Sequence, residues 1–258
     1  MAGTNRSAPF VSVVLATRDR PGFLALALEC YRQQIYPRSE LIVIDDGDRF
    51  PASPDIVDGA GGRLFRAPTG TPLGAKLNMG VDAANGELCQ KMDDDDWYSP
   101  AFLETMVGAW LHSRSLLCRP QVAYLAPILF FDLARWEVRR SGGKGTTGAT
   151  LLFSREDCER LPFRPLSSCE DLWLAYDHTR AGSRLLPIDA PEIYLAVRHA
   201  GPSRDRQHCW THKPDGRTVE QVLQGEPLYE KQPADLLPPW ALHRYRQLQR
   251  DAAAARTP

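Results

Sequence analysis

The chain has 258 residues, of which 43% are hydrophobic and 24% are charged, and this composition is typical of a globular protein. Its formal net charge of -1 argues against a dedicated nucleic-acid binder, and no apolar run reaches the ~18 residues that a membrane span needs. The polar N-terminus does not resemble a signal peptide, and the six cysteines form no C-x-x-C pair. We therefore expect reduced thiols in a cytoplasmic protein.

The first hundred residues alternate between predicted strands and helices. Residues 10–16 are a β-branched run typical of a buried strand, and Pro21 suits the first turn of the helix that follows. Further strands are predicted at 41–44, 63–66 and 87–92, a loop at 51–62 and a helix at 73–84. This alternation predicts an α/β fold with a mostly parallel sheet and helices on its faces. In the first helix, apolar residues repeat at every fourth position, namely Phe23, Ala27, Tyr31 and Ile35.

The second half of the chain has a less regular pattern. Helices are predicted at 102–111 and 170–180, and extended segments at 122–131, 149–153 and 193–199. In the 170–180 helix, we expect Leu172, Trp173 and Tyr176 to pack inward. The Gly-rich segment 141–147 lacks the pattern of a phosphate-binding loop and is interpreted as a mobile lid or an acceptor loop. The last ~40 residues contain several prolines and are expected to form a poorly packed tail.

Four consecutive aspartates, at 93–96, follow the predicted strand at 87–92. Polar residues, including Thr17 and Asp46, also end the first two strands, and in a parallel sheet ligands bind beyond these carboxyl ends. Carboxylate oxygens are the ligands that Mg²⁺ and Mn²⁺ prefer. Apolar side chains bracket the run, so we favour a half-buried cation site over the alternative of a solvated acidic turn.

Four segments of the sequence resemble family-2 glycosyltransferases with the GT-A fold. They are VSVVLATRDRP, LIVIDDG, GAKLNMGVDAANGE and KMDDDDWYSP, in the order and at roughly the spacing found in that family. The resemblance implies a Rossmann-like, mostly parallel central sheet that is continuous with a smaller acceptor-side subdomain. It also implies a nucleotide-sugar-binding half at 1–105, an acceptor-binding half with the catalytic base at 106–215, and a C-terminal extension at 216–258.

The resemblance implies a nucleotide-diphosphate sugar as the donor. Thr17, with Asp19 close by, would contact the nucleoside, and Asp46 would bind the base, although an Asp-Gly turn is the alternative interpretation of that segment. Lys76 and Asn78 lie in a G-x-K-x-N-x-G pattern. A lysine there suits a pyrophosphate or the acidic run, and the alternative is an exposed surface lysine. Both residues are therefore candidates for binding the nucleotide sugar.

The Asp-x-Asp element of the family implies a bound Mn²⁺ or Mg²⁺. Asp93 and Asp94 would lie near the ribose and phosphate, and Asp95 would bind the metal directly, with Asp93 as a further candidate ligand. His199 falls where some members of the family supply another metal ligand. A partly buried, hydrogen-bonded histidine is the alternative at that position.

Glu170 and Asp171 begin the predicted helix at 170–180 and resemble the Glu-Asp motif of the family. The resemblance implies that Asp171 is the general base of an inverting sugar transfer and that Glu170 supports it or contacts the acceptor. The alternative is that two acidic residues favour a helix N-terminus because of the helix dipole.

The sequence leaves the acceptor open. A saccharide, a lipid-linked glycan, a small molecule, a peptide and a modified nucleobase all remain candidates, and the oligomeric state is not indicated. A catalytically degenerate module that binds nucleotide or carbohydrate is the alternative function, although the presence of both Asp95 and Asp171 argues against it. Four tryptophans are candidate platforms for stacking against a sugar, namely Trp97, Trp136, Trp173 and Trp210.

Overall fold

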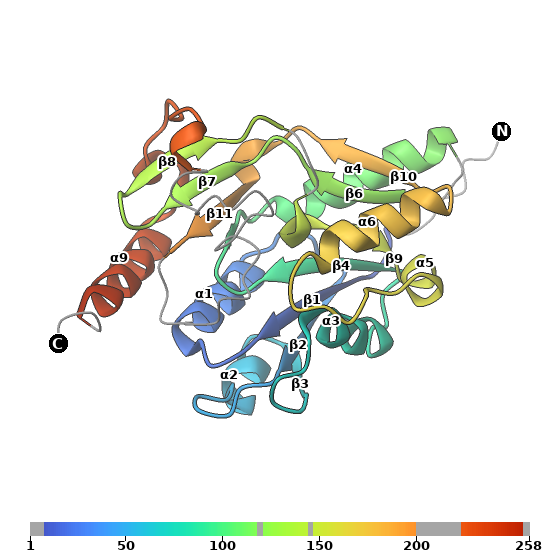
Figure 1. The fold of residues 1–258 in the computed structure, drawn as a ribbon, viewed down its shortest axis with the longest axis horizontal. Coiled ribbons are helices and arrows are strands. Elements are labelled where there is room, and N and C mark those ends of the chain that lie inside the picture. The colour runs from blue at the N-terminus through green and yellow to red at the C-terminus, as the bar shows by residue number, and fades with distance from the viewer. Residues whose placement is uncertain (1–7, 118–120, 144–146, 200–222, 255–258) are drawn as a thin grey trace.

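A seven-stranded sheet forms the centre of the molecule in the computed structural model, which describes residues 8–117, 121–143, 147–199 and 223–254 (Figure 1). The strand order is β10-β6-β9-β4-β1-β2-β3. All neighbouring pairs are parallel except those made by β9, which runs antiparallel to β4 and β6. The prediction of a mostly parallel sheet is therefore confirmed. The strands are β1 (Val11–Thr17), β2 (Ser39–Asp45), β3 (Gly62–Arg66), β4 (Leu88–Asp93), β6 (Gln121–Leu125), β9 (Leu152–Ser154) and β10 (Arg184–Ile188).

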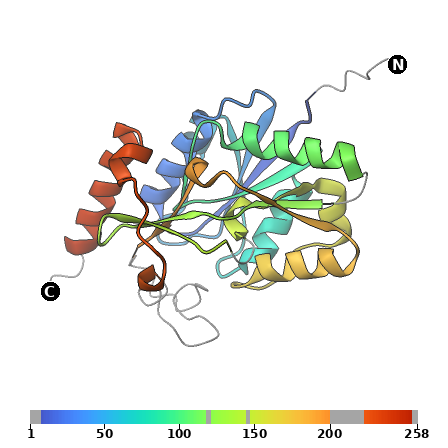
Figure 2. The same ribbon diagram turned by 90° about the horizontal axis from the view of Figure 1, so that it is seen from above.

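Helices cover both faces of this sheet because each central strand is apolar on both sides. In β1, Val13 and Leu15 pack into the cluster that contains the helices α1 and α4, whereas Val14 packs on the opposite side with α3 and α6. Figure 2 shows α1 and α4 on one side of the sheet and α6 on the other. The helices of this part of the chain are α1 (Pro21–Arg32), α2 (Pro54–Gly59), α3 (Leu73–Asp82), α4 (Phe102–Leu117), α5 (Arg155–Arg160) and α6 (Glu170–Arg180).

Two local predictions in the first half of the chain were wrong. The segment 51–62 was expected to be a loop, but it contains the short helix α2, in which Pro54 supplies the first helical residue. The first helix ends at Arg32, so Ile35 lies beyond it and is 55% exposed. The four-residue apolar repeat therefore continued past the actual end of the helix.

A second, four-stranded sheet has the order β5-β11-β7-β8. Its presence corrects the prediction of one extended segment at 122–131, because the chain leaves the first sheet after β6 and enters the second at β7. Pro127 lies between the two strands and cannot donate a backbone hydrogen bond, which favours a break in the ladder there. The strands of this sheet are β5 (Trp97–Tyr98), β7 (Leu129–Asp132), β8 (Glu137–Arg140) and β11 (Tyr194–Arg198).

The C-terminal segment is packed, contrary to the expected tail. It contains α8 (Pro233–Leu236) and α9 (Pro239–Ala254), and α9 lies beside α1 (Figure 1). Ala241 and Tyr245 are fully buried and are spaced by four residues, so they form one face of α9. The hydroxyl of Tyr245 donates a hydrogen bond to the backbone carbonyl of Asp95, at 3.3 Å. The last described helix, α9, therefore contacts the backbone of the acidic run.

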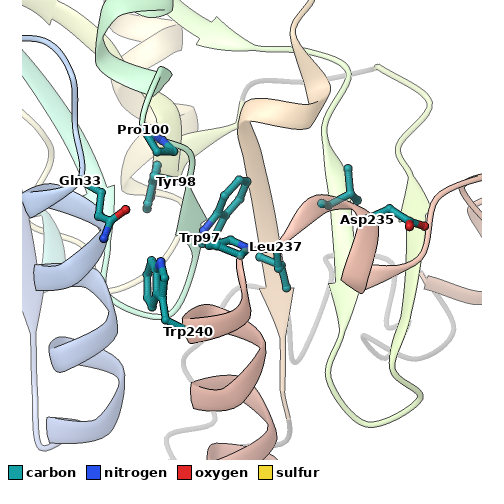
Figure 3. A pocket seen from close by; sticks show the side chains of 9 residues that line it. Gln33, Trp97, Tyr98, Pro100, Asp235, Leu237 and Trp240 are labelled. Atoms are coloured by element: carbon teal, nitrogen blue, oxygen red, sulfur yellow. The ribbon is translucent and has the colours of Figure 1, made fainter.

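A pocket of about 310 Å³ lies where the C-terminal segment meets α1 and β5 (Figure 3). Trp97 and Trp240 line it, with Gln33 on the α1 side. None of the candidate donor-binding, metal-binding or catalytic residues borders this pocket. It therefore lies apart from the predicted site.

The described part of the chain has no helix that is both long enough and apolar enough to cross a membrane. Cys30, Cys89, Cys158 and Cys169 are free thiols in the structure, whereas the remaining two cysteines lie outside the described residues. The cytoplasmic location expected from the sequence stays a prediction.

We predict that Tyr245→Ala lowers the free energy of unfolding by about 3–5 kcal/mol, because it removes a fully buried aromatic side chain. Urea denaturation measures this loss. His243→Ala, an exposed position of the same helix, is the matched control and is expected to change stability by less than about 0.5 kcal/mol. Equal stability of the two variants would show that α9 does not pack as described.

Candidate active site

Three neighbouring strand ends meet at one edge of the large sheet. The register pairs Thr17 of β1 with Asp45 of β2, and Ala16 of β1 with Asp93 of β4. Because these strands are parallel, the polar residues that follow them lie on the same side of the molecule. The structure thus brings together the strand ends that the sequence analysis singled out.

The acidic run at 93–96 is more buried than expected. Asp94 is fully buried, accepts a hydrogen bond from the Thr17 hydroxyl at 2.7 Å and forms an ion pair with Arg20 at 2.5 Å. Burial raises the pKa of Asp94 to about 6, against the opposing effect of Arg20. Asp95 also accepts from Arg20, at 3.0 Å, and lies 3.1 Å from Nε2 of His199. One arginine therefore bridges two of the four carboxylates.

Asp96 connects the acidic run to the second sheet. Its carboxylate accepts hydrogen bonds from the Tyr194 hydroxyl and from the backbone N–H of Val197, the latter at 2.8 Å. Arg198 lies 3.7 Å away. Burial raises the pKa of Asp96 to about 8. Since all its partners belong to β11, Asp96 positions the run and was not among the predicted site residues.

Asp93 pairs with a different cation, Lys91, which also lies near Glu170 at the start of α6. The Nζ of Lys91 lies 2.5 Å from Asp93 and 3.9 Å from Glu170, and this lysine is only 2% exposed. Burial raises the pKa of Glu170 to about 7, while the positive charge of Lys91 acts in the opposite direction. Lys91 was missed in the sequence analysis. The sequence did contain an indication of this role, because a lysine inside a buried strand needs an acidic partner.

Asp171 lies at the start of α6, next to this charged cluster. Its carboxylate accepts a hydrogen bond from the Leu172 backbone N–H at 2.8 Å, and burial raises its pKa while Lys91 lowers it. Gly148 packs directly against Asp171, since a Cβ atom at that glycine would overlap with the carboxylate. The positive charge of Lys91 thus acts on both Glu170 and Asp171. Gly148 leaves space for the Asp171 carboxylate.

The outward face of α6 corrects a prediction. Leu172, Trp173 and Tyr176 were expected to pack inward, but they are 51%, 38% and 52% exposed. Glu170, Leu174, Ala175 and His178 face the core instead. The spacing of residues 170, 174 and 178 defines the buried stripe, and its first member is an acidic residue that apolar periodicity does not detect.

Asp46 and Lys76 form a second buried pair at the strand ends. The Nζ of Lys76 lies 2.5 Å from the Asp46 carboxylate and donates to the backbone carbonyl of Thr17 at 3.2 Å. Asp46 also accepts from the Gly70 N–H at 3.1 Å. The structure therefore places Lys76 against Asp46 and Thr17, and these contacts do not involve the acidic run. Lys76 is buried, so the alternative interpretation of an exposed surface lysine is wrong.

Asp19 and Asn78 have well-defined structural partners. Asp19 has a positive φ of 51° and accepts from the backbone N–H groups of Arg49 and Phe50, at 2.9 and 2.7 Å, so it holds the loop after β2. Both ends of the Asn78 amide bond the backbone of Phe163, at 2.8 and 2.9 Å. Donor contacts by these two residues stay predictions, and the Asn78 amide already makes two hydrogen bonds to Phe163.

A metal site made by protein atoms alone is not formed in the described part of the chain, where no three His, Cys, Asp or Glu side chains are grouped around a common point. Asp95 and His199 nevertheless lie side by side, and the imidazole stacks on Phe23 with ring centroids 4.3 Å apart. Nδ1 of His199 is buried and has no hydrogen-bond partner among the described residues. Two side-chain ligands suit a cation that takes its other ligands from substrate phosphates and water.

We predict that Asn78→Ala lowers the free energy of unfolding by about 1–3 kcal/mol, because two buried backbone groups of Phe163 lose their partners. Thermal or urea unfolding measures the change, and Asn85→Ala, on an exposed turn beyond the same helix, serves for comparison. If Asn78→Ala instead weakened nucleotide binding at unchanged stability, the donor-contact role implied by the sequence pattern would be favoured.

Comparisons with known proteins agree with this fold. The sequence model described as "Glycosyl transferase family 2" matches residues 12–152, more than half of the chain. The Bacillus subtilis (strain 168) protein named "Putative glycosyltransferase EpsH" is 33% identical over 105 residues. That match covers 38% of this chain and 30% of the relative, so the chain spans less than a third of the relative's length.

Solved structures of low sequence identity share the architecture. The crystal structure of S. aureus TarS 1-349 in complex with UDP-GlcNAc has a TM-score of 0.58 and 16% identity, covering 74% of this chain and 59% of that one. The mannosyltransferase PcManGT from Pyrobaculum calidifontis, in complex with GDP-Man and Mn²⁺, has a TM-score of 0.57 and 19% identity, covering 98% of this chain and 77% of that one. The chain belongs to glycosyl transferase family 2 and has the GT-A fold.

Proposed function

We propose that this chain transfers a sugar from a nucleotide-diphosphate sugar to an acceptor hydroxyl, with inversion at the anomeric carbon. The proposal is carried by the buried acidic run, in which Asp94 and Asp95 pair with Arg20 while Asp93 pairs with Lys91, which also lies near Glu170. UDP-GlcNAc and GDP-Man in the structures of similar fold support a donor of this class.

On the donor side, Thr17, Asp19 and Asp46 would contact the nucleoside, since they lie at the ends of β1 and β2. Lys76 would act through Asp46, because its ammonium group lies 2.5 Å from that carboxylate and orients it. Asp94 would lie near the ribose and phosphate. Its bond to the Thr17 hydroxyl, at 2.7 Å, fixes the relative position of the first strand end and the acidic run.

The residues at this edge fit a divalent cation, Mn²⁺ or Mg²⁺. Asp95 and His199 would hold it, with Asp93 as a further candidate because its carboxylate is 35% exposed. Nδ1 of His199 has no hydrogen-bond partner among the described residues, which supports an imidazole that gains a partner when the cation and the nucleotide are bound. When bound, such a cation neutralises the charge that develops on a departing diphosphate. PcManGT in complex with GDP-Man and Mn²⁺ supports a metal of this kind.

On the acceptor side, Asp171 would be the general base. The acceptor oxygen attacks the anomeric carbon, its proton passes to the Asp171 carboxylate, and the bond between the sugar and the diphosphate breaks. Lys91 opposes the effect of burial on the pKa of Asp171 and so favours the ionised carboxylate that a base requires. Glu170, which lies 3.9 Å from Lys91, would share this charge and support the base.

A degenerate module that only binds nucleotide or carbohydrate is the second candidate function. It needs the donor side of the cluster but has no use for Asp171. The close fit of Gly148 against that carboxylate favours the enzyme, because a glycine at this point keeps room for a side chain that a binding module does not require. Release of sugar from a bound donor distinguishes the two functions.

We predict that Asp95→Ala abolishes the part of nucleotide affinity that depends on Mn²⁺. Calorimetry against UDP, GDP, dTDP and CDP, with and without Mn²⁺, first identifies the nucleotide for the wild type. Asp189→Ala, which removes an exposed carboxylate near β10, is the control and is expected to bind as the wild type does. Retention of Mn²⁺-dependent binding by Asp95→Ala would contradict the metal assignment.

We predict that Asp171→Asn spares nucleotide binding but slows sugar transfer by about 10²–10⁴-fold, the usual effect of removing a general base. Release of nucleoside diphosphate from the sugar nucleotide, with water as the acceptor, is a suitable assay before the true acceptor is identified.

The pH dependence gives an independent readout of the same residue. The base acts when it is ionised, so the wild-type rate rises with pH through the pKa of Asp171, which burial raises above its ordinary value. The rate of the Asp171→Asn variant is expected not to show this rise with pH, which is the acidic limb of the pH–rate profile. An unchanged limb, or an unchanged rate, would assign the base to another residue.

A further inference from the structure

Asp96, the fourth carboxylate of the acidic run, is tied to the second sheet. It is 2% exposed. One of its carboxylate oxygens accepts a hydrogen bond from the backbone N–H of Val197, at 2.8 Å, and the other accepts from the Tyr194 hydroxyl. A carboxylate that is so deeply buried and already has two donors is poorly placed to contact a cation or a substrate itself. Its partners point instead to a role in holding β11.

The bond from Asp96 continues a hydrogen-bond ladder that β5 is too short to complete. β5 pairs with β11 at two positions, Tyr98 with Tyr194 and Trp97 with Leu195. Backbone N–H groups alternate between the two edges of a strand, so the next N–H on this edge after Leu195 belongs to Val197. Asp96 directly precedes β5 and bonds that N–H with its side chain. The end of β11 is therefore attached to the acidic run.

This end of β11 leads to His199. Nε2 of His199 lies 3.1 Å from the Asp95 carboxylate, and its ring stacks on Phe23. Two residues of extended chain span at most about 7 Å, so a shift of Val197 also moves His199. Asp95 and Asp96 are neighbours in the sequence. The bond between Asp96 and Val197 therefore closes a short loop of contacts that joins the two candidate metal ligands.

The strand β7 offers the alternative means of placing His199. It lies on the edge of β11 opposite to β5 and pairs with β11 from Leu195 to Arg198. The Leu133 N–H also donates to the Arg198 carbonyl, at 2.9 Å. These bonds fix the direction of β11, but none of them involves the acidic run. The bond from Asp96 does, so it sets the distance between the end of β11 and Asp95.

We propose that Asp96 is a positioning residue for the metal site. By holding Val197, it keeps the His199 imidazole where it and the Asp95 carboxylate bind the same cation. Groups that orient metal ligands change metal affinity without touching the metal. This inference rests on the proposed function, because it takes Asp95 and His199 as the ligands. It gives a role to the one carboxylate of the acidic run that the proposed function leaves without one.

Calorimetry on the full chain, with and without Mn²⁺, tests the proposal with the nucleoside diphosphate that the wild type binds. We expect Asp96→Ala to lower the Mn²⁺-dependent affinity by about 10- to 100-fold, the usual effect of losing a group that orients a metal ligand. His199→Ala is expected to cause a loss of similar size. The double variant is expected to lose little more than either single variant, because both changes remove the same contact. Additive losses, or no loss in Asp96→Ala, would overturn the proposal.

Asp96→Asn separates positioning from charge. The asparagine oxygen can accept from the Val197 N–H, and its NH₂ group can donate to the Tyr194 hydroxyl oxygen. We therefore expect Asp96→Asn to stay within about threefold of the wild-type affinity, because the hydrogen bonds remain. A loss as large as that of Asp96→Ala would show that the negative charge itself is required, and would overturn the positioning role.

Two further variants control for folding. Asp157→Ala removes another buried aspartate, which bonds Ser154 at 2.6 Å. Ser154 pairs with Leu88, at the opposite end of β4 from the acidic run, so normal Mn²⁺-dependent affinity is expected. Tyr194→Phe removes only the hydroxyl bond to Asp96 and replaces Asp96→Ala if that variant does not fold. It is expected to lower the affinity in the wild type but not in His199→Ala, and an equal loss in both would contradict the proposal.

Histidine NMR of the metal-free chain separates this inference from the proposed function. The ring protons of His199 are identified by their absence in His199→Ala, and stacking on Phe23 shifts them. We expect Asp96→Ala to move these signals and Asp157→Ala to leave them in place. Unmoved signals in Asp96→Ala would overturn the positioning role and leave the proposed metal site standing. A wild type that binds nucleotide equally with and without Mn²⁺ would instead reject that metal site, and this inference with it.

Discussion

The structure depends on providing partners for four consecutive carboxyl groups at a largely buried position. Burying an ionised carboxylate without partners is costly, so each one needs a cation or hydrogen-bond donors close by. These come from three distant parts of the chain: the end of β1 with the start of α1, the interior of β4, and the end of β11. The helix α9 bonds the backbone carbonyl of Asp95. These contacts tie elements that are distant in the sequence to the acidic run.

The partners divide the run into parts with different chemistry. Asp94 and Asp95 share Arg20, on the side where β1 and β2 end. Asp93 shares Lys91 with Glu170, on the side of α6. Asp96 bonds β11 and joins the two sheets. A sugar transfer needs a place for the departing diphosphate and a place for the attacking hydroxyl, and this division supplies two adjacent environments of that kind.

Much of the fold was predictable because its signals are local. Buried strands that end in polar residues, and helices between them, are visible in the sequence, and the acidic run follows one of these strands. What was missed depends on tertiary contacts. Lys91 lies within an apolar strand, and only its contacts with Asp93 and Glu170 explain it. The C-terminal segment resembled a tail because its prolines obscured a helix with a narrow apolar face. In α6, apolar residues face solvent because Glu170 begins the buried stripe.

The most direct test is the position of Mn²⁺ in crystals grown with the nucleoside diphosphate, located by anomalous scattering at the manganese edge. The account predicts one strong peak in contact with the Asp95 carboxylate and with the phosphates of the nucleotide. A bound nucleotide at the ends of β1 and β2 with no manganese near Asp95 would contradict the metal assignment. Manganese and nucleotide bound elsewhere on the molecule would contradict the site as a whole.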